Sequence, residues 1–306
     1  MSKTKTKKAN NFTITLLFLI VVFLPLVSCF SQTDINEKTD TPVIIPYRID
    51  GKNTIPKDSD LKEIQPIKLI NHKGCSLIAP ENTLPAYRLS KQMGYSYVET
   101  DIHFTKDSVA VCLHDSNINR TARKINGDIP EKGIRISNIT YEEALQYDFG
   151  SWKSEKYKGT KIPTFEQFIR LCRELHLFPY VEIKHGNLCT DTQLRSLEDT
   201  VMKYNMENAV TFIGFDCTCL EKLGVLCPAS RLGILCKRPM HLDFRRICNM
   251  KTDTNEVFIS SRLDCAEGIV EFCRAYQIPL EVWVVDSPKD YERLNPYISG
   301  VITNCL

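Results

Sequence analysis

Short apolar runs rich in β-branched and aromatic residues alternate with helix-like patterns from about residue 67 to the end of the chain. This alternation is typical of parallel strands that are joined by crossover helices. The runs predict eight parallel strands, at 67–72, 97–104, 178–184, 209–214, 231–236, 256–260, 280–285 and 299–303. Because eight strands in a chain of this length match a (β/α)8 barrel, we predict an α/β fold of the TIM-barrel class for residues 63–306.

One further apolar run, 109–114, follows the second strand after the short turn 106–108. A parallel crossover needs a dozen or more residues, so this run should return as an antiparallel hairpin. Such a return brings His114 beside Asp101, near the C-terminal mouth of the barrel. The segment between the hairpin and a helix predicted at about 164–176 exceeds normal loop lengths. We therefore predict a small insertion at about 116–160, after the second strand and its hairpin.

The first 28 residues have the order of an export signal. Lysines 3, 5, 7 and 8 precede nine unbroken apolar residues at 16–24, too short a run to span a bilayer comfortably. The ending Leu26-Val27-Ser28-Cys29 resembles a bacterial lipobox. We predict a lipoprotein signal peptide at 1–28, a lipidated Cys29, a flexible tether at 29–62 and a location on the bacterial cell envelope, exported and lipid-anchored. A signal cut by the ordinary peptidase, or an uncleaved anchor, is the alternative.

The composition of the chain, 43% hydrophobic and 25% charged, is that of a globular protein and excludes a disordered or many-spanning membrane chain. The formal charge of +2 becomes −2 without the four lysines of the signal, so no nucleic-acid partner is predicted. Of the thirteen cysteines, Cys29 belongs to the lipobox and several others lie in apolar runs, which predicts mostly unpaired, buried thiols. No particular oligomeric state is predicted.

Acidic residues lie on the predicted second and third strands of the barrel. Residues two apart on a strand face the same side, so Glu99 points with Asp101, and Glu182 points with Lys184. Active sites of this fold are built at the C-terminal ends of the strands. Three carboxylates that converge there would repel one another without a cation, and hard divalent ions prefer oxygen ligands. We therefore predict one divalent cation, Mg2+ or Ca2+, on Glu99, Asp101 and Glu182.

Two histidines end neighbouring segments of this mouth: His72 closes the first strand, and His114 closes the returning hairpin. A histidine pair beside a metal site can accept and donate protons near neutral pH. Lys73 and Lys184 add positive charge, and the combination suggests a phosphate ester as substrate. His103 shares a face with Asp101, but we interpret it as a residue of the hairpin base.

The order and spacing of these residues resemble the signature of the glycerophosphodiester phosphodiesterase family, in its bacterial lipoprotein form. The resemblance covers about residues 68–304. The motifs that carry it are His72-Lys73-Gly74, Pro80-Glu81-Asn82-Thr83, Glu99-Thr100-Asp101, Thr105-Lys106-Asp107, His114-Asp115, Arg120-Thr121, Gly150-Ser151-Trp152, Ile162-Pro163-Thr164, Glu182-Ile183-Lys184, Trp283 and Gly300-Val301-Ile302-Thr303.

The resemblance implies a function and a role for each site residue. It implies that the chain is an enzyme that hydrolyses glycerophosphodiesters to glycerol 3-phosphate and an alcohol, with a divalent cation as cofactor. Glu81 would lie at or beside the cation, His72 would act as general base and His114 as general acid. Lys184 and Lys73 would contact the substrate phosphate, and Trp283 would form an aromatic wall beside the substrate.

Three residues depart from the usual pattern of that family, and the turn 106–108 lacks its usual glycine. Lys73 stands where arginine is usual, which replaces a bidentate contact to phosphate by a point charge. Asp286 and Asn304 stand where asparagine and aspartate are more common.

Two alternative functions follow from the same residues. The barrel and its metal site could act on another phosphodiester, such as a phosphoinositide or a phospholipase D-like substrate. A non-catalytic lipoprotein that binds phospholipid head groups is the second alternative, which loss of a histidine or a metal carboxylate would favour; none is missing.

Overall fold

The computed structural model describes residues 67–306. The predicted signal peptide at 1–28, the lipidation of Cys29 and the tether at 29–62 lie outside the described residues. Among residues 67–306, no helix combines the length and apolar character needed to cross a bilayer.

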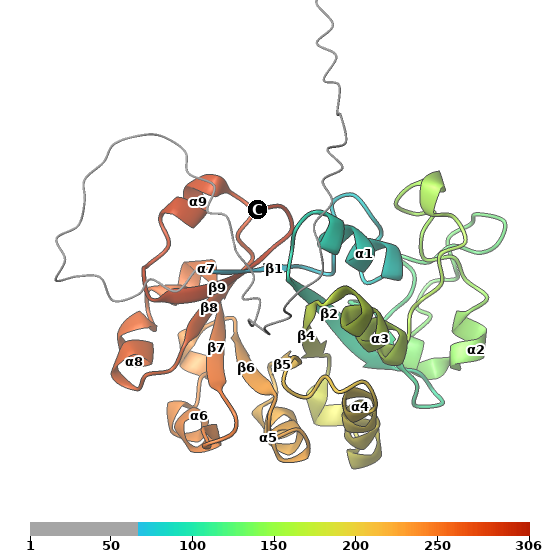
Figure 1. Cartoon of the computed structure of the whole chain (residues 1–306). Coiled ribbons are helices and arrows are strands. Elements are labelled where there is room, and N and C mark those ends of the chain that lie inside the picture. The colour runs from blue at the N-terminus through green and yellow to red at the C-terminus, as the bar shows by residue number, and fades with distance from the viewer. Residues whose placement is uncertain (1–66) are drawn as a thin grey trace, which may run out of the picture. The chain divides into compact units, whose positions relative to one another are not determined.

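Eight parallel strands form a closed barrel, which confirms the predicted fold (Figure 1). The strands follow one another around the barrel in chain order, and the first pairs with both the second and the last. They are β1 (Lys68–Asn71), β2 (Tyr97–Phe104), β4 (Phe178–Ile183), β5 (Thr211–Gly214), β6 (Arg231–Cys236), β7 (Val257–Arg262), β8 (Leu280–Trp283) and β9 (Ile298–Thr303). Each strand begins and ends within two residues of its predicted bounds. The agreement is close because strands of a parallel sheet are buried on both faces and are therefore continuous apolar runs in the sequence.

Strand β3 (Ala110–Cys112) is the predicted antiparallel return and lies outside the closed barrel. It pairs with the end of β2, with Ile102 opposite Cys112. Beyond this pair, the backbone N–H of Leu113 donates to the carbonyl of Asp101 at 2.9 Å. The return therefore places His114 directly beside the end of β2, as its length predicted.

Helices cover the outside of the barrel, as Figure 1 shows for α3, α4 and α5. Threonine capping boxes begin α3 and α4, at Thr164 and Thr190, and the Asp216 side chain caps α5. The helices are α1 (Leu84–Gln92), α3 (Phe165–Leu175), α4 (Asp191–Lys203), α5 (Cys217–Leu226), α6 (Phe244–Met250), α7 (Leu263–Ala266), α8 (Val270–Ala275) and α9 (Pro288–Glu292), with short 3-10 turns η3 (Gly186–Leu188) and η4 (Pro239–His241).

Two separate apolar layers hold the barrel together. The main hydrophobic core lies between strands and helices and includes Val98, Phe168 and Leu220. A smaller cluster fills the inside of the barrel, with Tyr180 and Phe258 among its members. These side chains fill the interior, so the barrel is not a pore. They close the barrel beneath its C-terminal mouth, and a site can be built on top of them.

The predicted insertion lies between β3 and α3 and has a small core of its own. It contains η1 (Ile136–Asn138), α2 (Tyr141–Ala144) and η2 (Glu155–Tyr157). Val111, Ile118, Ala144, Phe149 and Ile162 are buried in this core, apart from the main one. The backbone N–H of Lys106 donates to the carbonyl of Ile139, which joins the insertion to the hairpin turn.

The twelve cysteines in the described part of the chain are free, and most of them are buried, as their apolar surroundings predicted. Cys112 and Cys172 illustrate the reason: both lie in the main core, where a thiol packs as a small apolar group.

Candidate active site

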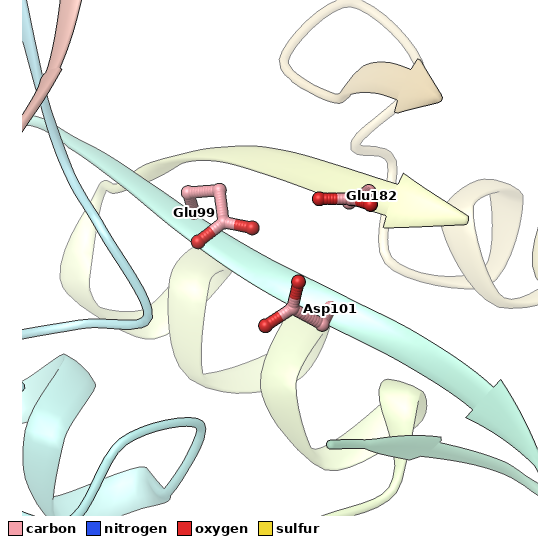
Figure 2. A group of neighbouring side chains, drawn as sticks. All are labelled: Glu99, Asp101 and Glu182. Atoms are coloured by element: carbon pink, nitrogen blue, oxygen red, sulfur yellow. The ribbon is translucent and has the colours of Figure 1, made fainter. Parts of the chain in front are cut away.

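Three carboxylates meet at the mouth of the barrel. Glu99 and Asp101 project from the same face of β2, and Asp101 lies opposite Glu182 in the pairing of β2 with β4. One carboxylate oxygen from each residue lies within 4.8 Å of the other two, and Figure 2 shows the three groups turned toward one another. Glu99 and Asp101 are fully buried. The structure thus brings together the three residues that the period-two argument selected.

Lys184 partly balances this cluster of negative charge. Its ammonium lies 2.8 Å from Asp101 Oδ1 and 2.7 Å from Glu182 Oε1. Burial would raise the pKa of Asp101, but the Lys184 ammonium holds it below its ordinary value. Burial and the charge of Asp101 instead raise the pKa of Glu99 and of Glu182. One lysine therefore does not suffice to keep all three carboxyl groups ionised.

The donor set of this cluster fits a hard divalent cation. Asp101 Oδ1 is buried, and apart from the Lys184 ammonium it has no hydrogen-bond partner within residues 67–306. Carboxylate oxygens are the ligands that Mg2+ and Ca2+ take in proteins. A cation held by Glu99, Asp101 and Glu182 would use this orphaned oxygen and would relieve the repulsion among the three groups.

Glu81 lies outside the group of three. Both of its carboxylate oxygens accept hydrogen bonds at 2.8 Å from the Arg120 guanidinium, and Lys73 Nζ lies 3.6 Å from Glu81 Oε1. The structure therefore places Lys73 against Glu81, while the backbone N–H of Lys73 donates to Glu99 Oε2 at 2.8 Å.

His72 is held by a chain of hydrogen bonds that ends on a carboxylate. Its Nδ1 lies 2.9 Å from Asn304 Oδ1. The side-chain amide and the backbone N–H of Asn304 donate to the two oxygens of Asp286, each at 2.7 Å. Because Asp286 engages the amide NH2, Asn304 presents its oxygen to His72, which fixes the proton on Nδ1 and leaves Nε2 able to accept one.

The environment keeps His72 neutral. Burial, together with the nearby Lys73 charge, lowers the pKa of His72 from 6.5 to about 4. A histidine with this pKa is uncharged at neutral pH and can serve as a base.

His114 is oriented by its neighbour in the chain. Its Nδ1 lies 2.7 Å from Asp115 Oδ1, and Arg120 Nε donates to Asp115 Oδ2 at 2.6 Å. Burial would raise the pKa of Asp115, but hydrogen bonds from Arg120 and His114 lower it to about 2. An ionised Asp115 holds the imidazole of His114 through Nδ1, which leaves Nε2 for proton transfer to a substrate oxygen.

A cavity of about 260 Å3 joins these groups at the mouth. Glu99, Glu182, Lys184 and both histidines are among the residues that line it. The other lining residues are largely apolar and include Ile213, Phe215, Leu235, Trp283 and Ile302. Trp283 packs edge-on against Phe215 and donates from Nε1 to the carbonyl of Ser260. Lys73, by contrast, does not line this cavity.

Several residues at this site were not recognised from the sequence as functional. Asn82 donates to Asp101 Oδ2 at 2.7 Å and accepts from the backbone N–H of Asp101. Arg120 joins Glu81 to Asp115, and Asn304 with Asp286 supports His72. Phe215 and Lys237 line the cavity from β5 and β6 ends. Asn82 and Arg120 belong to two of the family motifs in the sequence, so those motifs could have identified both residues.

Comparison with known proteins gives one consistent family. The model of the glycerophosphoryl diester phosphodiesterase family matches residues 72–305. A glycerophosphodiester phosphodiesterase of Caldanaerobacter subterraneus subsp. tengcongensis is 28% identical over 241 residues, which is 77% of this chain and 93% of that protein. The human glycerophosphodiester phosphodiesterase 1 is 28% identical over 177 residues, 56% of this chain and 51% of that protein.

Solved structures share the fold. A protein from Silicibacter pomeroyi, described as a glycerophosphoryl diester phosphodiesterase, has a TM-score of 0.68 at 18% identity, covering 79% of this chain and 90% of its own. A phosphodiesterase from Oleispira antarctica, solved in complex with the product sn-glycerol-3-phosphate, has a TM-score of 0.64 at 21% identity, covering 78% of this chain and 93% of its own.

Proposed function

This chain belongs to the glycerophosphoryl diester phosphodiesterase family and is a hydrolase of glycerophosphodiesters, and we propose that His72 and His114 carry out the proton transfers of that hydrolysis. The products are glycerol 3-phosphate and an alcohol. The observation that carries the proposal is that both histidines line one cavity with Glu99, Glu182 and Lys184. Each histidine is oriented through Nδ1, so each has Nε2 left for the substrate.

A divalent cation, Mg2+ or Ca2+, held by Glu99, Asp101 and Glu182, would supply the positive charge that a phosphate diester needs as charge develops on its oxygens. The residues of the chain do the rest. His72, neutral at pH 7, accepts the proton of a glycerol hydroxyl as that oxygen attacks phosphorus. His114 gives a proton to the oxygen of the departing alcohol. This attack closes a cyclic phosphate as the bond from phosphorus to the alcohol oxygen breaks. Water then opens the ring: His114 accepts a proton from the water and His72 returns one to the glycerol oxygen, which gives glycerol 3-phosphate.

The remaining charged groups hold the reacting atoms in place. Lys184, within hydrogen-bond distance of Asp101 and Glu182, is positioned to contact a phosphate oxygen once the cation balances those carboxylates. Glu81 would lie beside the cation, and its carboxylate pairs with Lys73 and Arg120. Lys73 would reach the phosphate only by leaving Glu81. Trp283 and Phe215 form the wall against which the glycerol carbons pack.

Release of glycerol 3-phosphate tests the proposal directly. The domain from about residue 60 is incubated with glycerophosphocholine, glycerophosphoethanolamine or glycerophosphoinositol, in Mg2+, Ca2+ or EDTA. We expect release that depends on the cation and that falls roughly 10²- to 10⁴-fold in His114→Ala. Bound cation without release from any of the three would overturn the assignment and would favour a different phosphodiester.

The location of the protein is part of the same proposal. The lipobox-like ending at Cys29 supports an envelope lipoprotein. Metabolic labelling of the full chain with a radioactive fatty acid is expected to mark the wild type and not Cys29→Ser. Equal labelling of both proteins would show that Cys29 does not carry the lipid.

A further inference from the structure

A second and larger cavity, of about 460 Å3, opens next to the active site. It lies between the end of the β2–β3 hairpin, the insertion, and the segment that runs from the end of β4 into the first turn of α4. Residues from these three segments line it: His103 and Lys106, then Ser116 and Arg135, then His185 and Gln193. Its volume is in the range of small-molecule sites, and the proton transfers described above make no use of it.

The lining of this second cavity is positively charged. Lys106 and Arg135 are exposed to it, and neither forms an ion pair within residues 67–306. Hydroxyl groups of Ser108, Ser116 and Ser137 lie on the same walls, and no carboxylate is among the lining residues. Asp107, in the same turn as Lys106, is not among the lining residues, and its Oδ1 accepts from Thr105 and from the backbone N–H of Tyr141. The two cations are thus available to a bound anion.

The second cavity adjoins the active site on the side of His114. Lys184 lines both cavities. His103, on the wall of the second one, contacts the backbone carbonyl of His114 through Nε2 at 3.2 Å. His72 and Trp283 line the first cavity and not the second. A substrate whose glycerol lies against Trp283 and whose leaving oxygen faces His114 therefore extends its alcohol toward Lys106 and Arg135.

We propose that the second cavity binds the alcohol portion of the substrate, and that it selects alcohols that carry an anionic group of their own, a phosphate above all. The inference rests on the proposed function and adds the substrate class to it. Lysine and arginine with surrounding hydroxyls are the donors that bind phosphate by charge-assisted hydrogen bonds. A cationic head group such as choline finds two like charges there and no carboxylate to pair with, and like charges oppose binding.

A ratio of specificity constants tests this selection. The kcat/KM of the full-length chain is measured on glycerophosphoinositol 4-phosphate and on glycerophosphocholine, at low and at high salt. We expect the wild type to favour the phosphate-bearing substrate about a hundredfold, the equivalent of two charge-assisted contacts, and the preference to shrink at high salt. Lys106→Gln and Arg135→Gln should each lower the ratio about tenfold. Arg195→Gln, an exposed cation on α4 that does not line the cavity, is the matched control.

The outcomes separate this inference from the function on which it rests. Release from both substrates, with a ratio that neither variant changes, would overturn the head-group selection and leave the hydrolase assignment intact. A wild type that prefers glycerophosphocholine would do the same. Release from neither substrate would overturn the proposed function itself. Because Lys106 and Arg135 are exposed, their replacement is not expected to impair folding, which a circular dichroism spectrum checks.

Discussion

The hydrogen-bond chain from His72 through Asn304 to Asp286 allows the base of the reaction to be retuned by exchanging two neighbours. Asp286→Asn removes the charge that accepts both donors of Asn304. One such charge-assisted bond is worth about 1.5 kcal/mol. Without it, the Asn304 amide can turn its NH2 toward His72, and kcat/KM should fall roughly tenfold.

The reciprocal double variant, Asp286→Asn with Asn304→Asp, restores the chain with the charge moved next to the imidazole. The new carboxylate would stand where Asn304 Oδ1 now lies, 2.9 Å from His72 Nδ1. An opposite charge at this range raises a histidine pKa by about 1 to 3 units. His72 starts from a pKa of about 4, and the base must be neutral to act. The acid limb of kcat/KM should therefore move to higher pH by about 1 to 3 units.

The assay is the pH profile of glycerol 3-phosphate release from pH 4 to 8, with cation content measured for each variant. Recovery of activity in the double variant, together with a shifted acid limb, supports His72 as the base held by this chain. An acid limb that coincides with that of the wild type, at equal cation content, refutes the reasoning, because the carboxylate would then stand beside a group that does not control the rate.

Three further predictions concern the cation, the acid and a buried histidine. Glu99→Gln removes one charge from the carboxylate cluster, so both cation affinity by calorimetry and turnover should fall; unchanged values for both would refute the cation site. His114→Ala should leave cation binding nearly intact while turnover falls roughly 10²- to 10⁴-fold, and loss of the cation instead would make His114 a ligand. Burial lowers the pKa of His103 from 6.5 to about 4. The unfolded chain therefore takes up a proton first as the pH falls from 6.5, and the free energy of unfolding should drop by up to roughly 3 kcal/mol by pH 4. In urea titrations His103→Gln should lack this part of the drop, and an identical pH dependence in both proteins would contradict it.

The fold and the carboxylate cluster could be predicted from the sequence because both depend on local periodicity. Apolar runs marked the eight barrel strands, and the short turn at 106–108 forced the hairpin that carries His114. The spacing of Glu99 and Asp101 put them on one face of β2, where the structure also brings Glu182.

The supports of the histidines could not be predicted in this way. His72 and Asn304 are 232 positions apart, and only the closure of the barrel between β1 and β9 brings them together. Asp286 and Asn304 were noticed as departures from a family pattern, yet nothing local showed that they compensate each other. Arg120 and Asn82 act through side-chain contacts across loops, which no strand or helix period encodes.

The insertion leaves the barrel and returns to it at almost the same place. Val111 and Thr164 form a bridge, and the backbone N–H of Cys112 donates to the carbonyl of Pro163 at 2.9 Å. Residues 113–163 are therefore a loop with adjoining ends and a core of its own, the arrangement that tolerates replacement of a segment as a unit. Such a cassette carries His114, Asp115 and Arg135, whereas the barrel keeps the carboxylates, His72 and Trp283. Chimaeras that exchange only residues 113–163 would replace the part of the enzyme that contacts the leaving alcohol. They would leave unchanged the strand pairing that closes the barrel.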